Sequence, residues 1–199
     1  MLFCRCIACA LLVVYLGLSY GLYVPDWKFE LLRSISMPPT NGSFVYTVTC
    51  STRGDHGPAC NAVGMIDRCV LGLNHLYPKP IYRNFKECNI SSIGQISDNS
   101  PSWCHTPFDL EGILSSLTAA VTCIIGLRYG HILGQLQDHK ELLYNWCIFS
   151  FLFLGIGLFL ALVGMPLNKP LYTISYMLVT SAPIGITFSA LYILVSSKQ

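Results

Sequence analysis

Four apolar segments dominate this sequence and limit what it can fold into. Each is close to the roughly 20 residues that a helix needs to cross a bilayer; they cover residues 7–24, 112–133, 144–165 and 171–195. Arg128 is the one formal charge inside them. Charged residues make up only 11% of the chain, against about 25% in soluble domains. The sequence therefore predicts an all-α membrane protein with four transmembrane helices, whose partner is the lipid bilayer.

The polar stretch after the first segment divides the chain into three parts. We expect residues 1–24 to form the first transmembrane helix, residues 25–111 a large loop with disulfides, and residues 112–199 a three-helix transmembrane region. The first part has a second interpretation, because Arg5 and the apolar run that follows also resemble a secretory signal peptide. Both interpretations place the loop outside the cytosol.

The large loop carries residues typical of a lumenal or extracellular segment. Asn41 and Asn89 each begin an Asn-x-Ser sequon for N-glycosylation. Five of the ten cysteines also lie there, as expected in an oxidising compartment: Cys50, Cys60, Cys69, Cys88 and Cys104. We predict the disulfides Cys50–Cys60 and Cys88–Cys104, and we assign Cys69 to the core side of a helix over residues 62–77. Both termini are then cytosolic.

Other features concern the transmembrane segments. Small residues recur every fourth position along the second segment, which predicts one face that packs closely against another helix: Thr118, Thr122, Gly126, Gly130 and Gly134. Asp109 is expected to cap this helix, and Pro183 to kink the last one. Near the N-terminus, Cys4, Cys6 and Cys9 are either small apolar residues or acylation sites.

Two groups of polar residues are candidates for binding. Arg128 and His131 lie near the cytosolic end of the second segment, where they could receive the phosphates of a nucleotide-bearing donor, although such an arginine can also extend to lipid headgroups. In the outer loop, Asp67, Arg68 and His75 could contact an acceptor or form structural pairs. The sequence has no metal-ligand spacing, P-loop, nucleophile elbow or basic run. We expect no metal, no tightly bound cofactor and no nucleic-acid partner.

Several ordered stretches resemble one family of membrane enzymes. They are PACNAVGMIDR at residues 58–68, LGLNHLY at 71–77, PFDLEGILSS at 107–116, IGLRYGH at 125–131 and PLNKPLY at 166–172. In these stretches, and over nearly its whole length, the chain resembles the heparan-alpha-glucosaminide N-acetyltransferase family.

The resemblance implies transfer of an acetyl group from cytosolic acetyl-CoA, a co-substrate, to a terminal glucosamine on the lumenal side. It implies that Arg128 and His131 lie on the acetyl-CoA side, and that Asp67, Arg68 and His75 belong to the acceptor-side loop. A lysosome- or vacuole-like endomembrane or the plasma membrane is the expected location. The family's essential histidine lies in an N-terminal part without a counterpart here, so the catalytic residue stays unknown. We expect a central-to-C-terminal portion that is inactive alone and acts with a missing N-terminal part or as a homo-oligomer.

Two other four-span classes are alternatives. A claudin-like junctional or adhesion protein without catalytic activity would fit the chain length, the large first outer loop and the Cys50–Cys60 pair. However, Trp27 and Trp103 lie far from that pair in sequence, unlike the expected arrangement. A tetraspanin would have its large loop before the last span rather than after the first.

Overall fold

The computed structural model describes residues 2–31, 44–57, 59–72, 75–76, 86–88, 100–106, 112–136 and 138–196. The chain forms two compact units. The first, called the membrane unit here, contains Met1–Tyr15 and Leu114–Gln199, and the second, called the loop unit, contains Leu16–Ile113.

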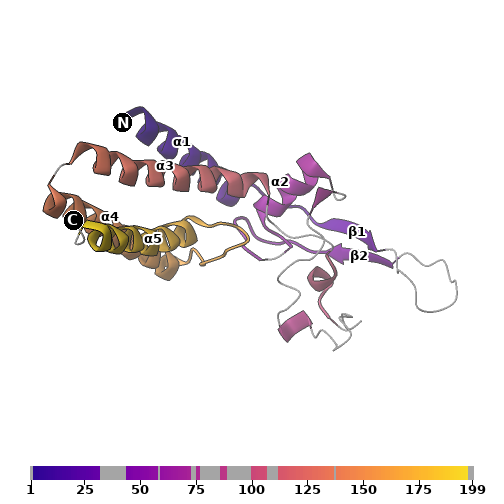
Figure 1. The fold of residues 1–199 in the computed structure, drawn as a ribbon. Helices are drawn as coiled ribbons and strands as arrows, with labels where there is room; N and C mark the ends of the chain where they lie inside the picture. Colours follow the sequence, from indigo (N-terminus) through magenta and orange to yellow (C-terminus); the bar gives the residue numbers. More distant parts are fainter. Residues whose placement is uncertain are drawn as a thin grey trace. The chain divides into compact units, whose positions relative to one another are not determined.

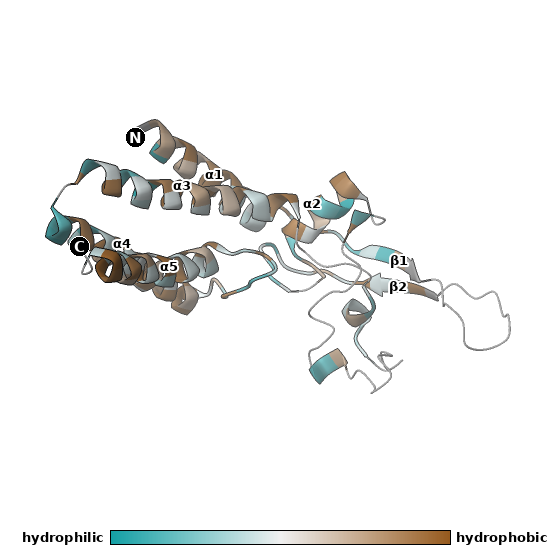
Figure 2. Ribbon diagram, viewed as in Figure 1, coloured by the Kyte–Doolittle hydropathy of each residue, from teal (hydrophilic) through white to brown (hydrophobic). Residues whose placement is uncertain are grey.

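Four described helices are long and apolar enough to cross a membrane, which confirms the predicted fold class. They are α1 (Leu2–Gly21), α3 (Ile113–Gln135), α4 (His139–Val163) and α5 (Ile174–Ser196). Figure 2 shows hydrophobic colouring along α4 and α5 and hydrophilic colouring near the start of α4. The protein is an integral membrane protein.

The ends of α1 and α4 differ from the prediction. Helix α1 begins before residue 7 and ends at Gly21 rather than residue 24. Helix α4 begins at His139 rather than residue 144, because the Asp138 side chain accepts a hydrogen bond from the backbone N–H of Lys140 at 3.0 Å. Glu141 in the first turn also suits the positive end of the helix dipole. The length of an apolar run does not predict a helix start that is formed by polar capping residues.

Helices α4 and α5 lie side by side and are the most closely associated pair in the membrane unit (Figure 1). Gly157 makes this possible, because a Cβ there would be 2.8 Å from Val179 Cγ2 and 3.0 Å from the backbone oxygen of Ser175. Between the two helices, Gly164 ends α4 in a left-handed conformation with φ 117°. Thr173 Oγ1 then donates to the backbone oxygen of Pro166 at 2.8 Å. Backbones that approach this closely are typical of helix pairs in membranes.

The row of small residues on α3 packs over only part of its length. Thr118 is fully buried, and Thr122 shares a hydrogen bond of 3.3 Å with the hydroxyl of Tyr172. In contrast, a Cβ at Gly126, Gly130 or Gly134 would have nothing within 4 Å. The glycine half of the predicted close-packing face has no neighbour among the described residues, so that half stays a prediction.

The loop unit contains a small antiparallel sheet that was not predicted. Strands β1 (Trp27–Leu31) and β2 (Phe44–Val48) pair with Trp27 opposite Val48 (Figure 1). One face packs on a buried apolar core made of Val24, Phe29, Val48, Cys50, Ala59 and Ala62. Both predicted disulfides are confirmed, Cys50–Cys60 and Cys88–Cys104, and each connects parts of this unit.

The predicted helix over residues 62–77 is shorter in the structure. Helix α2 (Ala62–Leu71) starts after Asn61, whose side chain accepts from the backbone N–H of Gly64 at 2.6 Å. It ends at Gly72, where φ is +73°, a conformation that glycine adopts readily. The assignment of Cys69 to the core is wrong, because Cys69 is exposed. The buried side of α2 lies nearer its start and includes Asp67.

Candidate functional site

Asp67 is the most deeply buried charged residue described in the loop unit, with 0% of its surface exposed. Its Oδ1 accepts a hydrogen bond of 2.8 Å from the backbone N–H of Ile113, the first residue of α3. A Cβ at Gly112 would collide with the Asp67 carboxylate, so this approach requires glycine. Asp67 therefore binds a backbone donor that a helix start leaves without an internal partner.

The protonation of Asp67 is shifted by its surroundings. Burial raises the pKa of Asp67, while the N–H of Ile113 and the charge of Arg68 act in the opposite sense. Its Oδ2 has no hydrogen-bond partner among the residues that the structure describes. A carboxyl group in this position favours its neutral form more than a solvated one does. Asp109, the predicted cap of α3, lies outside the described residues.

Arg68 and His75 face other parts of the loop unit. The guanidinium carbon of Arg68 lies 4.0 Å from the ring centroid of Trp27, a cation–π arrangement. His75 is exposed after the end of α2, and its Nδ1 lies 2.9 Å from the backbone oxygen of Leu71. These hydrogen bonds and ring contacts lead from the three residues to three different elements, while the charge of Arg68 also acts on Asp67. A joint role toward an acceptor stays a prediction.

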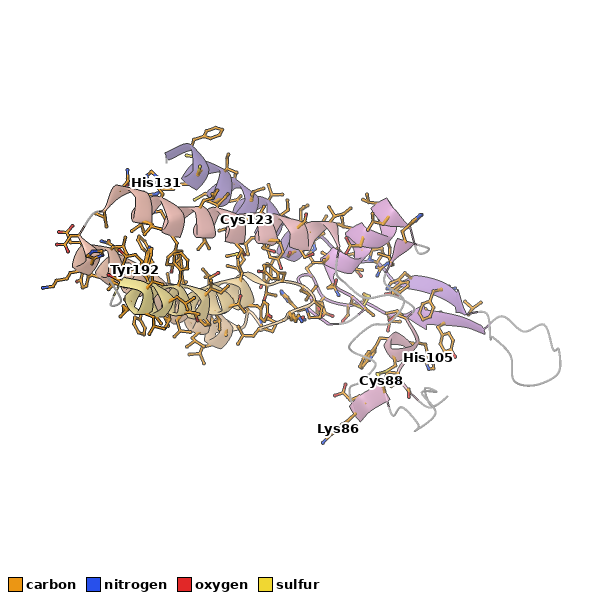
Figure 3. All side chains as sticks on the ribbon, in the orientation of Figure 1. Lys86, Cys88, His105, Cys123, His131 and Tyr192 are labelled. Carbon is orange, nitrogen blue, oxygen red and sulfur yellow. A yellow bond between two sulfur atoms is a disulfide. The ribbon has the colours of Figure 1, made fainter. Side chains whose placement is uncertain are left out.

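A row of aromatic rings crosses the sheet. Trp27 packs against Phe29 at 5.2 Å between ring centroids, and Phe29 stacks on Tyr46 at 5.6 Å. Tyr46 in turn stacks on His105 at 4.5 Å. His105 follows Cys104, so the Cys88–Cys104 disulfide holds this end of the row (Figure 3). In the sequence, this row of rings is indicated by the alternation of Trp27 and Phe29 along one strand.

A second polar cluster lies inside the membrane unit. The Tyr129 hydroxyl lies 2.9 Å from Ser150 Oγ, and Ser150 Oγ also donates to the backbone oxygen of Trp146 at 2.8 Å. The Trp146 indole N–H donates to the backbone oxygen of Tyr129 at 3.2 Å. Gly185 of α5 leaves room for this cluster, since a Cβ there would clash with both Ser150 Oγ and the Tyr129 ring. Three helices thus meet around buried hydroxyl groups.

Near this cluster, the start of α4 is joined to the end of α5. His139 Nδ1 and the Tyr192 hydroxyl share a hydrogen bond of 2.6 Å. Tyr192 also packs edge-on against Trp146 at 5.5 Å between centroids (Figure 3). No short sequence pattern predicts this contact, because the two residues are 53 positions apart.

The two residues expected to receive a donor are both on α3. Arg128 is half-buried, and its guanidinium carbon lies 5.7 Å from the ring centroid of Phe149 on α4. His131 is half-buried one turn further along α3 (Figure 3). Their spacing of three residues places them on the same side of the helix. The contact with Phe149 joins Arg128 to α4.

Some predicted positions fall beyond the described residues. The sequons at Asn41 and Asn89 are among them, so glycosylation stays a prediction. Among the described residues, no group of three or more histidine, cysteine or acidic side chains is placed to hold a metal ion.

Comparison with known proteins adds one relative. No protein-family model matches the chain. The chain is similar to mouse heparan-alpha-glucosaminide N-acetyltransferase, with 31% identity over 138 aligned positions that cover 62% of this chain. The chain spans only 18% of that relative's length. This similarity supports a distant relationship to that N-acetyltransferase.

Proposed function

We propose that this chain is a membrane-embedded part of a transmembrane acetyltransferase that passes acetyl from cytosolic acetyl-CoA to a terminal glucosamine on the lumenal side. The observation that carries the proposal is the 31% identity to the mouse N-acetyltransferase. The presence of four apolar helices and a disulfide-bonded loop unit in one chain supports it, since donor and acceptor would lie on opposite sides of a membrane. An endomembrane location follows from the same relationship.

The two ends of α3 would then face different reactants. The first residue of α3 belongs to the loop unit, whose disulfides are typical of an oxidising lumen. Arg128 lies 15 residues after Ile113, which corresponds to about 22 Å along a helix. That distance is a large part of a hydrocarbon core of about 30 Å. We assign Arg128 and His131 to the cytosolic side, where they would attract the phosphates of acetyl-CoA.

The acceptor side would use the loop unit. Asp67 and Arg68 hold α3 and β1 in place through their contacts with Ile113 and Trp27, so we assign them positioning roles. His75 is exposed and accessible to an acceptor. Acetyl transfer to an amine needs a general base within hydrogen-bond reach of that amine. We assign no described residue to this role and expect no turnover from the chain alone.

Donor binding is the direct test. We would place the purified chain in nanodiscs and measure binding of acetyl-CoA, with free acetate as a ligand that lacks phosphates. Arg128→Gln should weaken acetyl-CoA binding, whereas Arg53→Gln, an exposed change in the loop unit, should not. If acetyl-CoA does not bind, or if both variants bind equally well, Arg128 does not belong to a donor site.

A second test concerns the acceptor. Nanodiscs would receive labelled acetyl-CoA and a glucosamine-terminated oligosaccharide, with and without the corresponding N-terminal part of the mouse relative supplied as a separate chain. Transfer that needs both chains would support the proposal. Turnover by this chain alone that is lost in His75→Ala would mean that it carries its own base, which would contradict the expected inactivity.

The assigned sides are tested by glycosylation. Expression in cells followed by glycosidase treatment should reveal a mobility shift that disappears in Asn41→Gln/Asn89→Gln. Cleavage of the unshifted loop by a protease added on the cytosolic side would show that the assigned orientation is inverted.

A further inference from the structure

Three reduced cysteines gather in the first turns of α1. Cys4, Cys6 and Cys9 are all exposed. Because successive residues on a helix turn by about 100°, Cys6 lies about 200° and Cys9 about 140° from Cys4 around the axis. Cys4 therefore points away from the other two, which lie about 60° apart on one side of the helix. This spread does not suit a shared metal ion, and no such group is placed for one among the described residues.

The depth of these thiols follows from the length of α1. The helix has 20 residues, which gives about 30 Å, the thickness of the hydrocarbon core. Its last turn leads into the disulfide-bonded loop unit, so its first turn lies at the opposite, reducing face. Arg5 marks that interface, because a charge deeper in the bilayer is costly. Cys4 and Cys6 flank Arg5, whereas Cys9 lies about 6 Å further in.

Helix α1 contacts the rest of the membrane unit through a different part of its length. The Tyr15 hydroxyl donates to the backbone oxygen of Leu171 at 3.1 Å, and Tyr15 is 2% exposed. Near the cysteines, Phe3 and Ile7 are exposed instead. This tertiary contact supports α1 as a retained helix rather than a removed signal peptide. It also leaves the first turns facing lipid.

Two other reduced cysteines show why position matters. Cys123 is also exposed, but it lies ten residues after the start of α3, about 15 Å along the helix and near the middle of the bilayer (Figure 3). Cys69 is exposed in the loop unit, on the side of the disulfides. Among the reduced cysteines, Cys4 and Cys6 combine exposure with the level of the cytosolic headgroups.

We propose that Cys4 and Cys6 are sites of S-acylation by a long-chain fatty acyl group. The donor is a fatty acyl-CoA, and a membrane acyltransferase of the cell catalyses the step. The cysteine sulfur attacks the carbonyl carbon of the acyl-CoA and forms a new thioester. The bond between that carbon and the sulfur of CoA breaks, and the thiol proton leaves with CoA as CoA–SH. The acyl chain then lies in the leaflet beside α1, where exposed apolar side chains already face lipid.

Acyl exchange on the full chain tests this. The protein would be expressed in cells with a C-terminal tag, its free thiols blocked, its thioesters cleaved with hydroxylamine, and the released thiols labelled with a polyethylene-glycol maleimide. We expect a hydroxylamine-dependent mobility shift, and an intact mass increased by long-chain acyl groups. Cys4→Ser/Cys6→Ser should abolish the shift, whereas Cys123→Ser and Cys69→Ser should retain it.

Several outcomes would overturn the proposal. No hydroxylamine-dependent shift in the full-length chain would exclude thioesters at these positions. A mature protein that lacks residues 1–21 by intact mass would show that α1 is removed. A shift that persists in Cys4→Ser/Cys6→Ser but is lost in Cys9→Ser would place the acyl group one turn deeper than the headgroup level. An added mass of acetyl instead of a long chain would also contradict it.

Discussion

The loop unit and the membrane unit are stabilised by different means, although one chain builds both. The loop unit has two disulfides, a buried carboxyl group and a row of stacked rings around a small apolar core. The membrane unit has glycines at close helix contacts and hydroxyl groups that bond across helices. Water drives apolar side chains together in the first unit. Lipid gives no such force between helices, so close backbone contact and hydrogen bonds are needed in the second.

The comparison also explains where cysteine is bonded. A small domain with a limited apolar core gains much from a cross-link, because the core alone provides little stability. In the membrane unit, the bilayer already restricts each helix, and the described cysteines there remain reduced. The following predictions test this division, in order of decreasing effect.

Loss of the Cys88–Cys104 disulfide should have the largest effect, and only in the loop unit. We expect Cys88→Ser/Cys104→Ser to lower its free energy of unfolding by about 3 kcal/mol, from the chain entropy of a loop of this length. Urea unfolding followed by tryptophan fluorescence measures it, because two of the three tryptophans, Trp27 and Trp103, lie in this unit.

Cys69→Ser is the matched control, since Cys69 is exposed and reduced. An equal loss of stability in this variant would show that the effect comes from replacing cysteine by serine rather than from loss of the cross-link. An unchanged midpoint in the double variant would mean that the apolar core alone stabilises the unit.

Close helix contact should matter most in the membrane unit. Gly157→Ala puts a Cβ against Val179 and Ser175, and we expect a loss of about 1–3 kcal/mol from overpacking. Gly155→Ala lies on the same helix with nothing within 4 Å, so its change should stay within about 0.5 kcal/mol. Unfolding in mixed micelles with increasing SDS, followed by circular dichroism, compares them. Equal effects would contradict the contact between α4 and α5.

Loss of one hydroxyl bond in the membrane unit should cost less. Tyr129→Phe removes the bond to Ser150, and bonds of this type contribute about 0.6 kcal/mol on average. Tyr144→Phe is the control, because Tyr144 is 68% exposed on α4. The same SDS titration applies. A loss above about 2 kcal/mol for Tyr129→Phe would show that the buried cluster acts as a unit.

The smallest effect concerns the pH dependence of the loop unit. Because the pKa of Asp67 is raised in the folded state, the folded unit binds this proton more tightly than the unfolded chain does. The resulting stability is complete below the unfolded pKa and is lost as the pH rises through the folded pKa. Asp67→Asn keeps an oxygen for the N–H of Ile113 but cannot ionise. It should therefore gain stability relative to wild type as the pH rises from acidic to neutral.

Fluorescence unfolding midpoints at a series of pH values measure this difference. Burial lowers the pKa of His56, which gives the opposite pH dependence, but His56 is present in both proteins and its contribution cancels. A constant difference between Asp67→Asn and wild type at every pH would mean that the Asp67 pKa is the same in both states.

The features that the sequence predicted are local ones. Four apolar runs of sufficient length predict four helices, and an error of a few residues in the bounds of a run does not change that number. Cys50 and Cys60 are close in sequence, and so are Cys88 and Cys104. Each disulfide therefore closes only a short loop of the chain. Helical spacing failed for Cys69, because it does not say which turns of a short helix are buried, and Cys69 lies in the exposed last turn of α2.

The features that the sequence missed join distant positions. Asp67 and Ile113 are 46 residues apart, and His139 and Tyr192 are 53 apart, so no short pattern relates them. Strand β1 alternates apolar and charged residues, but β2 does not alternate regularly, and Trp27 pairs with Val48 far along the chain. As a result, Asp67, Arg68 and His75 were predicted as one group, whereas their side chains contact three different elements.

The hydrogen bond between Asp67 and Ile113 has a consequence for synthesis on the ribosome. Asp67 leaves the ribosome 46 residues before Ile113. At about 5–20 residues per second, α2 has roughly 2–9 seconds to fold before the first turn of α3 is made. The carboxylate of Asp67, which accepts the hydrogen bond, is therefore present before the backbone N–H of Ile113 is translated. In this order of events, α2 is available to cap the first turn of α3 as soon as that turn is made.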